Sequence, residues 1–236
     1  AEDAADAAAI LVRRMEIASK RGRPQRTLSY VTKSHALQSN IGRPFPSRLT
    51  AEAGGVLILQ SCVGEGATSH VYIASKGEGV GVIKALKPGH EARASKEVRV
   101  LRLLDQRGVT HILPGELVTP SSIYFPKVLI PLDVVSNEMV RGLVSLLQAA
   151  HAAALFHRDV RPDNIMLDET GNVYLIDWGC AHLQEGSSPS PPFEGTFRFA
   201  SDAVLSAALS REHRLPEAKD DLESLVRSDL SINSQD

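Results

Sequence analysis

The chain has 236 residues, of which 43% are hydrophobic and 23% are charged, and its formal net charge is -2. These values fit one globular domain with a buried core. No apolar run approaches the roughly 20 residues that a membrane-spanning helix needs, so we expect no membrane partner. The two cysteines are too few for a secreted disulfide framework, and we therefore expect an intracellular protein, cytoplasmic or nuclear.

The first 50 residues differ in character from the rest. Residues 1–18 are rich in alanine and carry apolar residues at helical spacing, which predicts a helix. The basic run Lys20-Arg21-Gly22-Arg23-Pro24 resembles the AT-hook core, which enters the minor groove of A·T-rich DNA. A single short match more often marks a solvated basic linker, so we do not expect nucleic acid as a partner. We expect residues 1–50 to form a partly disordered N-terminal helix and linker, and residues 51–236 to form the domain.

A glycine-bearing turn follows between two apolar runs. The sequence Val63-Gly64-Glu65-Gly66-Ala67-Thr68-Ser69-His70-Val71 predicts a hairpin turn that carries two glycines. Glycine pairs in hairpins also occur for structural reasons alone.

The next predicted strand, residues 80–86, carries one lysine, Lys84, within an apolar stretch. A half-buried ammonium group needs an anionic partner, because isolated burial of a charge is costly. The predicted helix over residues 91–106 offers Glu91 and Glu97. The residues alone leave open which of the two is the partner, and a glutamate on a solvated face is the alternative. Residues 128–132 then predict a strand and hinge, and residues 137–155 a long amphipathic helix.

The most informative segment is His157-Arg158-Asp159-Val160-Arg161-Pro162-Asp163-Asn164, followed by Asp177-Trp178-Gly179. Between them, residues 165–167 and 173–176 are short apolar runs joined by a polar turn. This pattern predicts a hairpin that brings Asn164 and Asp177 to one end of a small sheet. An acceptor for a hydroxyl proton, Asp159, and two oxygen-bearing metal ligands are the groups that phosphoryl transfer requires.

This array resembles the catalytic and magnesium-binding loops of the eukaryotic protein kinase superfamily. Residues 195–202, Gly-Thr-Phe-Arg-Phe-Ala-Ser-Asp, resemble the casein-kinase-type end of an activation segment, as do residues 220–225. The resemblance covers about residues 55–225. It implies an α+β, two-lobed fold with a small antiparallel lobe over about 55–132 and a mainly helical large lobe over about 133–236. The helices that normally complete the large lobe are missing from the pattern, so we expect this lobe to be C-terminally incomplete.

The resemblance also implies a site for ATP and Mg²⁺. The residues of the small lobe that it assigns to the nucleotide are Gly64 and Gly66 over the phosphates, Lys84 on the phosphates with Glu97 as its partner, and Val71 beside adenine. Here Ser69 replaces the third glycine of the family motif.

In the large lobe the resemblance makes Asp159 the group that orients a serine or threonine hydroxyl. It places Asn164 and Asp177 on the metal, and Arg161 in the position of the usual lysine, where it neutralises charge. Two further contacts are implied: Thr196 with Asp159 and Arg161, and Asp221 with main-chain N–H groups of the catalytic loop. Trp178 replaces the usual phenylalanine.

These assignments favour a serine/threonine protein kinase with protein substrates. One alternative is a truncated module that binds nucleotide or a partner protein without catalysis. Another is a small-molecule phosphotransferase of the aminoglycoside or choline kinase kind, which the segment 175–178 also resembles. Loss of the large-lobe helices would leave apolar side chains near solvent, namely Leu205, Leu209, Leu222 and Leu225.

Overall fold

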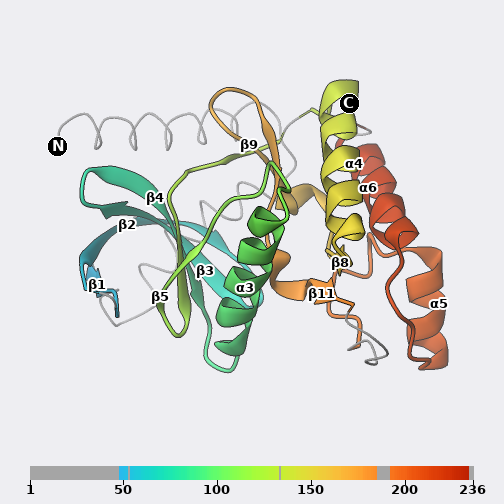
Figure 1. Cartoon of the computed structure of the whole chain (residues 1–236), viewed down its shortest axis with the longest axis horizontal. Coiled ribbons are helices and arrows are strands. Elements are labelled where there is room, and N and C mark those ends of the chain that lie inside the picture. The colour runs from blue at the N-terminus through green and yellow to red at the C-terminus, as the bar shows by residue number, and fades with distance from the viewer. Residues whose placement is uncertain (1–47, 53, 133, 185–191, 234–236) are drawn as a thin grey trace. The chain divides into compact units, whose positions relative to one another are not determined.

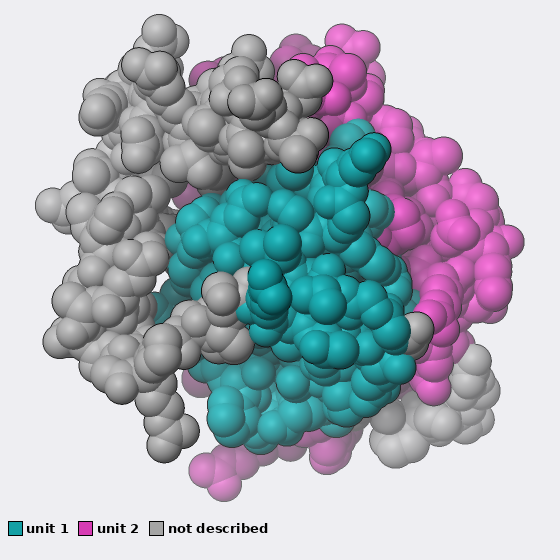
Figure 2. All heavy atoms as spheres, turned by 90° about the vertical axis from the view of Figure 1, so that its left-hand side faces the viewer, with its two compact units in different colours: residues 1–98, 115–128 teal, residues 99–114, 129–236 magenta. Residues whose placement is uncertain are grey.

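The structure is a computed structural model that describes residues 48–52, 54–132, 134–184 and 192–233 (Figure 1). The predicted helix over residues 1–18 and the basic motif at residues 20–24 lie outside the described residues. The chain divides into two compact units, one made of residues 1–98 and 115–128 and the other of residues 99–114 and 129–236 (Figure 2).

The first unit is built on a six-stranded antiparallel sheet with the strand order β1-β2-β3-β4-β6-β5. Its strands are β1 (Arg48–Thr50), β2 (Val56–Glu65), β3 (Ser69–Lys76), β4 (Gly79–Leu86), β5 (Glu116–Thr119) and β6 (Ser122–Phe125). The glycine-bearing turn joins β2 to β3, as the sequence predicted, with Glu65 opposite His70 in the register.

The two faces of this sheet bury different clusters. Side chains alternate along a strand, so Ile83 and Lys84 of β4 point to opposite faces. Ile83 belongs to a cluster with Leu57, Ala74 and Tyr124, among others. Leu86, which shares a face with Lys84, packs with Ile123 of β6 against Ala94 and Val98 of helix α3 (Ala92–Gln106). The alternation therefore turns Lys84 towards the helix side of the sheet.

Gly81 is required by the close approach of β4 to β6. A Cβ atom at this position would lie 2.2 Å from the carbonyl oxygen of Phe125 and 2.8 Å from the ring of Tyr124. Any larger residue would separate the two strands and disturb the register that places Lys84 opposite Ile123.

The second unit is mainly helical, with α4 (Asn137–Ala152), α5 (Asp202–Ser210) and α6 (Ala218–Asn233), and α4 packs beside α6 (Figure 1). A three-stranded sheet has the order β10-β9-β7, and a two-stranded sheet pairs β11 with β8. Their strands are β7 (Ile130–Pro131), β8 (Leu155–Phe156), β9 (Ile165–Leu167), β10 (Val173–Leu175) and β11 (His182–Leu183). Two short 3-10 turns, η1 (Pro162–Asn164) and η2 (Trp178–Cys180), carry the motif residues.

The hairpin predicted between the two motif segments is confirmed, with Leu175 of β10 opposite Ile165 of β9. Two other predictions need correction. The helix that starts at Asn137 ends at Ala152 rather than at residue 155, because Ala154 adopts a positive φ of 55° and β8 begins at Leu155. The strand predicted over residues 128–132 is reduced to Ile130–Pro131 and pairs with β9 in the second unit.

We predicted that four leucines, at positions 205, 209, 222 and 225, lie near solvent, and this prediction is correct for only some of them. Leu209 on α5 is 88% exposed, and Leu205 and Leu222 are partly buried. Leu225 is buried, with 3% of its surface exposed, so the prediction for this residue is wrong. Its helix, α6, packs against α4, and Leu225 therefore belongs to the core of the second unit.

Candidate active site

The first unit contains a buried ion pair between β4 and α3. The Nζ atom of Lys84 lies 2.7 Å from Oε2 of Glu97, and the exposed fractions of the two residues are 8% and 1%. The other candidate, Glu91, accepts hydrogen bonds from the main-chain N–H of Gly89 at the start of the helix. Loss of one partner from a buried pair typically costs about 3–5 kcal/mol, because the remaining charge is uncompensated. The pair therefore fixes the ammonium group on the helix side of the sheet.

The glycine turn between β2 and β3 has room over its backbone. Neither Gly64 nor Gly66 has a positive φ. A Cβ at Gly64 would meet Val71 at 3.4 Å, and one at Gly66 would meet the Ser69 carbonyl at 3.8 Å, which are ordinary contact distances. The fold of the first unit thus does not itself demand glycine at these positions. Close approach of a ligand to the backbone would account for the presence of glycine at both positions.

Asp159 in the second unit is held from both sides. Its Oδ1 atom accepts a hydrogen bond of 2.8 Å from the main-chain N–H of Thr196. Its Oδ2 atom lies 3.3 Å from Nδ2 of Asn164 and 3.3 Å from Nε of Arg161. Arg161 also binds Asp163 at 2.7 Å, so its guanidinium group bridges two carboxylates. Thr196 reaches Asp159 through its main chain, whereas the sequence had not specified which of its groups makes the contact.

Asn164 and Asp177 lie at one end of the β9–β10 hairpin. The main-chain N–H of Ile176 donates to the carbonyl oxygen of Asn164 at 2.9 Å, which links the residue before Asp177 to the end of the loop formed by residues 157–164. The side chain of Asn164 is oriented by a 2.8 Å bond from its Nδ2 to the carbonyl oxygen of Asp159. Asp177 adopts a left-handed backbone conformation with φ 62° and ψ 63°, which turns the chain directly after the strand. Asparagine and aspartate oxygens are ligands suited to Mg²⁺.

Asp221 on α6 supports the main chain of the loop formed by residues 157–164. One carboxylate oxygen accepts from the N–H of His157 and the other from the N–H of Arg158, each at 2.8 Å. His151 of α4 lies 2.9 Å from the same carboxylate through its Nε2 atom. Asp221 is 2% exposed, so these bonds satisfy a buried charge.

The imidazole ring of His157 is completely buried and uses both of its nitrogens. Nε2 lies 3.0 Å from the carbonyl oxygen of Ile176, and Nδ1 accepts from the N–H of Asp159 at 3.2 Å. This arrangement requires the neutral ring with its proton on Nε2. Burial lowers the pKa of His157 below its ordinary value of 6.5. The ring packs edge-on against Trp178 at 4.6 Å, and the indole N–H of Trp178 donates to the carbonyl oxygen of Leu175 at 3.0 Å.

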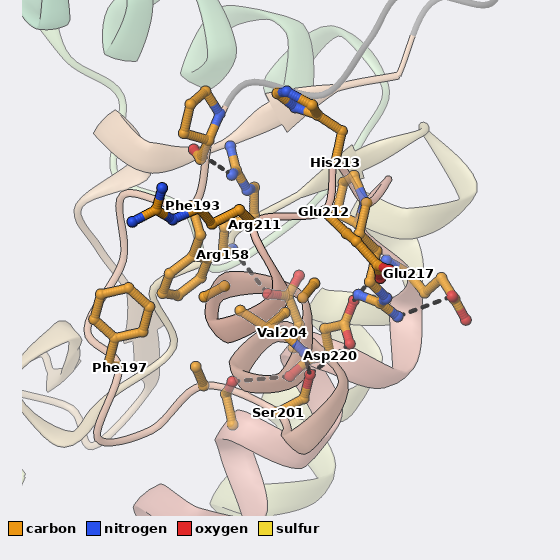
Figure 3. Close-up of a pocket in the computed structure, with 18 residues that line it drawn as sticks. Arg158, Phe193, Phe197, Ser201, Val204, Arg211, Glu212, His213, Glu217 and Asp220 are labelled. Atoms are coloured by element: carbon orange, nitrogen blue, oxygen red, sulfur yellow. Dashed lines mark hydrogen bonds and ion pairs between the residues drawn. The ribbon is translucent and has the colours of Figure 1, made fainter.

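The segment from Gly195 to Asp202 is bonded to the loop formed by residues 157–164 and to α6. A Cβ at Gly195 would lie 2.1 Å from the carbonyl oxygen of Arg158, so only glycine permits this approach. Ser201 donates to Asp220 at 2.7 Å, and Arg227 binds Asp202 at 2.6 Å. A pocket of about 350 Å³ lies beside this segment, and Figure 3 shows the Ser201–Asp220 bond at its wall.

The residues of these networks that the sequence analysis missed include His151 and Lys87. His151 lies near the end of a mostly apolar helix, and its position there was a usable signal. Lys87 donates from its Nζ atom to the carbonyl oxygen of Gly66 at 2.8 Å, and only its place directly after β4 hinted at a role.

Membrane-spanning helices and multi-ligand metal clusters are absent from the described residues. None of the helices in these ranges is long and apolar enough to cross a membrane. Likewise, no group of three or more His, Cys, Asp or Glu residues in the described part of the chain is arranged to hold a metal ion. Mg²⁺ is commonly bound by only one or two protein ligands together with substrate phosphates, so the second finding is compatible with the Asn164 and Asp177 assignment.

Comparison with known families decides the relationship. The family model of the protein kinase domain matches residues 58–218, which include Lys84, Glu97, Asp159, Asn164 and Asp177. The chain belongs to the protein kinase domain family. The kinase-like α+β fold expected from the sequence is thereby confirmed.

Several serine/threonine kinases are similar to this kinase-family chain. A probable casein kinase II subunit alpha homolog of Encephalitozoon cuniculi is 30% identical over 136 residues, covering 51% of this chain and 42% of the relative. The CBL-interacting serine/threonine-protein kinase 19 of Arabidopsis thaliana is 26% identical over 144 residues, covering 52% of this chain and 30% of that relative. The chain therefore spans less than half of the length of these curated relatives.

A solved structure supports the fold at low sequence identity. The structure of vaccinia related kinase 3 aligns with a TM-score of 0.61 and 17% identity, covering 85% of this chain and 72% of that one. At this identity the likeness speaks for the kinase fold alone.

Proposed function

We propose that this chain is a protein kinase that transfers the γ-phosphate of ATP to serine or threonine hydroxyls of proteins. The observation that carries the proposal is the setting of Asp159. Its carboxylate is held by Thr196 on one side and faces Asn164 and Arg161 on the other. A carboxylate oriented in this way suits the acceptance of a proton from a substrate hydroxyl.

Asp159 would orient the hydroxyl and accept its proton while the hydroxyl oxygen forms the new bond to phosphorus and ADP departs. Arg161 would neutralise negative charge that develops on the transferred group. Asp221 would keep the main chain of the catalytic loop in place through its bonds to His157 and Arg158. Serine and threonine are favoured over tyrosine because the segment 160–162 resembles the serine/threonine variant of the loop.

The residues present fit Mg²⁺ and ATP. In the first unit, Lys84 is fixed by its buried pair with Glu97, and Gly64 and Gly66 leave room over the backbone. We assign these residues to the phosphates and Val71 to the wall of the adenine pocket. In the second unit, Asn164 and Asp177 would hold Mg²⁺, which supplies neutralisation of phosphate charge when bound.

The test combines turnover with binding. Phosphate transfer from Mg-ATP to a mixture of serine- and threonine-containing peptides would be measured with the wild type and Asp159→Asn, and binding of Mg-ATP by calorimetry. We expect Asp159→Asn to lose turnover by about a hundredfold or more while it retains its affinity for Mg-ATP. Asp105→Asn, an exposed position on α3, is the matched control and should keep full turnover.

Two results would contradict the proposal. Unchanged turnover in Asp159→Asn would remove this residue from the chemistry. Undiminished binding of Mg-ATP in both Lys84→Ala and Asp177→Ala would reject the nucleotide assignment. Binding of Mg-ATP by a wild type that transfers no phosphate would favour the alternative of a nucleotide-binding module.

A further inference from the structure

The turn at the end of β2 is tied to the end of β4 by one lysine. The Nζ atom of Lys87 donates to the carbonyl oxygen of Gly66 at 2.8 Å and lies 3.2 Å from Oε1 of Glu65. Its main-chain N–H also donates to the carbonyl oxygen of Thr68 at 2.8 Å. We call residues 64–69 the glycine turn. Lys87 therefore holds this turn at three positions along its length.

The glycine turn needs such support because of its composition. Ordering one residue costs about 1–2 kcal/mol of backbone entropy, and glycine has more freedom to lose than other residues. Within the turn, Gly66 donates its N–H to the carbonyl oxygen of Ser69 at 2.8 Å. The side chains of Lys87 and Glu65 are only 28% and 29% exposed. Partial burial reduces screening by solvent and salt, so this pair holds the turn better than a fully exposed one would.

We propose that Lys87 is a positioning residue that holds the glycine turn in one conformation before a ligand arrives. It acts through Gly66 and Glu65, and it is separate from Lys84, which is engaged with Glu97. The ligand is Mg-ATP, so the binding part of the inference rests on the proposed function. When the turn is already ordered in the free protein, binding of Mg-ATP does not have to supply the free energy of ordering it, and the affinity for Mg-ATP is higher.

The first test measures the free protein by hydrogen exchange. In Lys87→Ala, we expect the peptide that covers residues 60–70 to exchange about three- to tenfold faster than in the wild type, the range expected from one modest polar contact. Lys76→Ala is the matched control. Lys76 lies at the end of β3 that is remote from the glycine turn, where it forms an ion pair with Glu116 of β5. Removal of the Lys76 side chain should therefore leave the exchange of this peptide unchanged.

The second test measures Mg-ATP by calorimetry with the same proteins. We expect Lys87→Ala to raise Kd about three- to tenfold and Lys76→Ala to leave it unchanged. Unchanged exchange in Lys87→Ala would overturn the inference, and so would an unchanged Kd in a variant whose turn exchanges faster. A wild type that fails to bind Mg-ATP would instead refute the proposed function, while the exchange measurement would still decide whether Lys87 orders the turn.

Discussion

Acidification should destabilise the second unit through His157. The neutral ring donates from Nε2 to Ile176 and accepts at Nδ1 from the N–H of Asp159, and no surface of the residue is exposed. Protonation of Nδ1 would place a new ring N–H against the main-chain N–H of Asp159, and two donors cannot form a hydrogen bond with each other. Burial accordingly lowers the pKa of His157 below 6.5, whereas the unfolded chain regains the ordinary value.

The sign and size of the effect follow from this difference. Below about pH 6.5 the unfolded chain binds a proton at His157 that the folded chain does not bind. The contribution of the neutral ring to the free energy of unfolding is therefore fully present well above this pH and is lost as the pH falls below it. Protonation of this one group in the unfolded chain can lower the free energy of unfolding by at most about 1.4 kcal/mol at about pH 5.5, a limit reached if the folded ring stays neutral there. Ordinary carboxyl groups titrate at about pH 4, below this window, and do not obscure it.

Urea unfolding at about pH 7.5 and about pH 5.5 would measure the change. Trp178 is the single tryptophan of the chain and packs on His157, so its fluorescence reports this unit. His157→Phe keeps a ring beside Trp178 but cannot titrate. It should be less stable overall and lose less stability on acidification. Equal losses in the wild type and His157→Phe would refute the assignment of the effect to this ring.

Two further substitutions probe the contacts that support the loop formed by residues 157–164. Asp221→Ala removes the acceptor of one buried and one partly buried main-chain N–H group and the partner of His151, so we expect urea unfolding to show that the free energy of unfolding falls by about 3–5 kcal/mol; a fall of less than about 1 kcal/mol would contradict this. Gly195→Ala places a methyl group against the Arg158 carbonyl, which should cost about 1–3 kcal/mol and lower turnover by at least about tenfold. Gly142→Ala on α4, where a Cβ finds ordinary contact, is the control and should be neutral or stabilising; equal behaviour of the two alanine variants would count against the steric argument.

The motif residues could be found from sequence because their chemistry is local. Asp159 and Asn164 lie five residues apart on one loop, and the hairpin between Asn164 and Asp177 follows from two short apolar runs and a polar turn. Glu97 was preferred to Glu91 because it precedes apolar positions in the way that the glutamate of the kinase family does, and the structure pairs it with Lys84.

The contacts that support these residues were harder to predict because they join distant parts of the chain. Lys87 and Glu65 are 22 residues apart, and His151 and Asp221 are 70 apart. Neither pairing has a periodic pattern that would reveal it. The short strand at Ile130–Pro131 was misplaced for a related reason. An apolar run predicts a strand but not the partner of that strand.

The glycines of this chain separate what the fold demands from what a ligand demands. At Gly81 and Gly195, a side-chain carbon would come as close as 2.2 Å and 2.1 Å to a backbone oxygen, so a library selected only for folded protein would reject larger residues there. Gly64 and Gly66 have no such restriction. The same library would accept alanine at both. Variants selected by folding alone would therefore carry substitutions at the glycine turn, and the selection would not reveal a loss of ligand binding there.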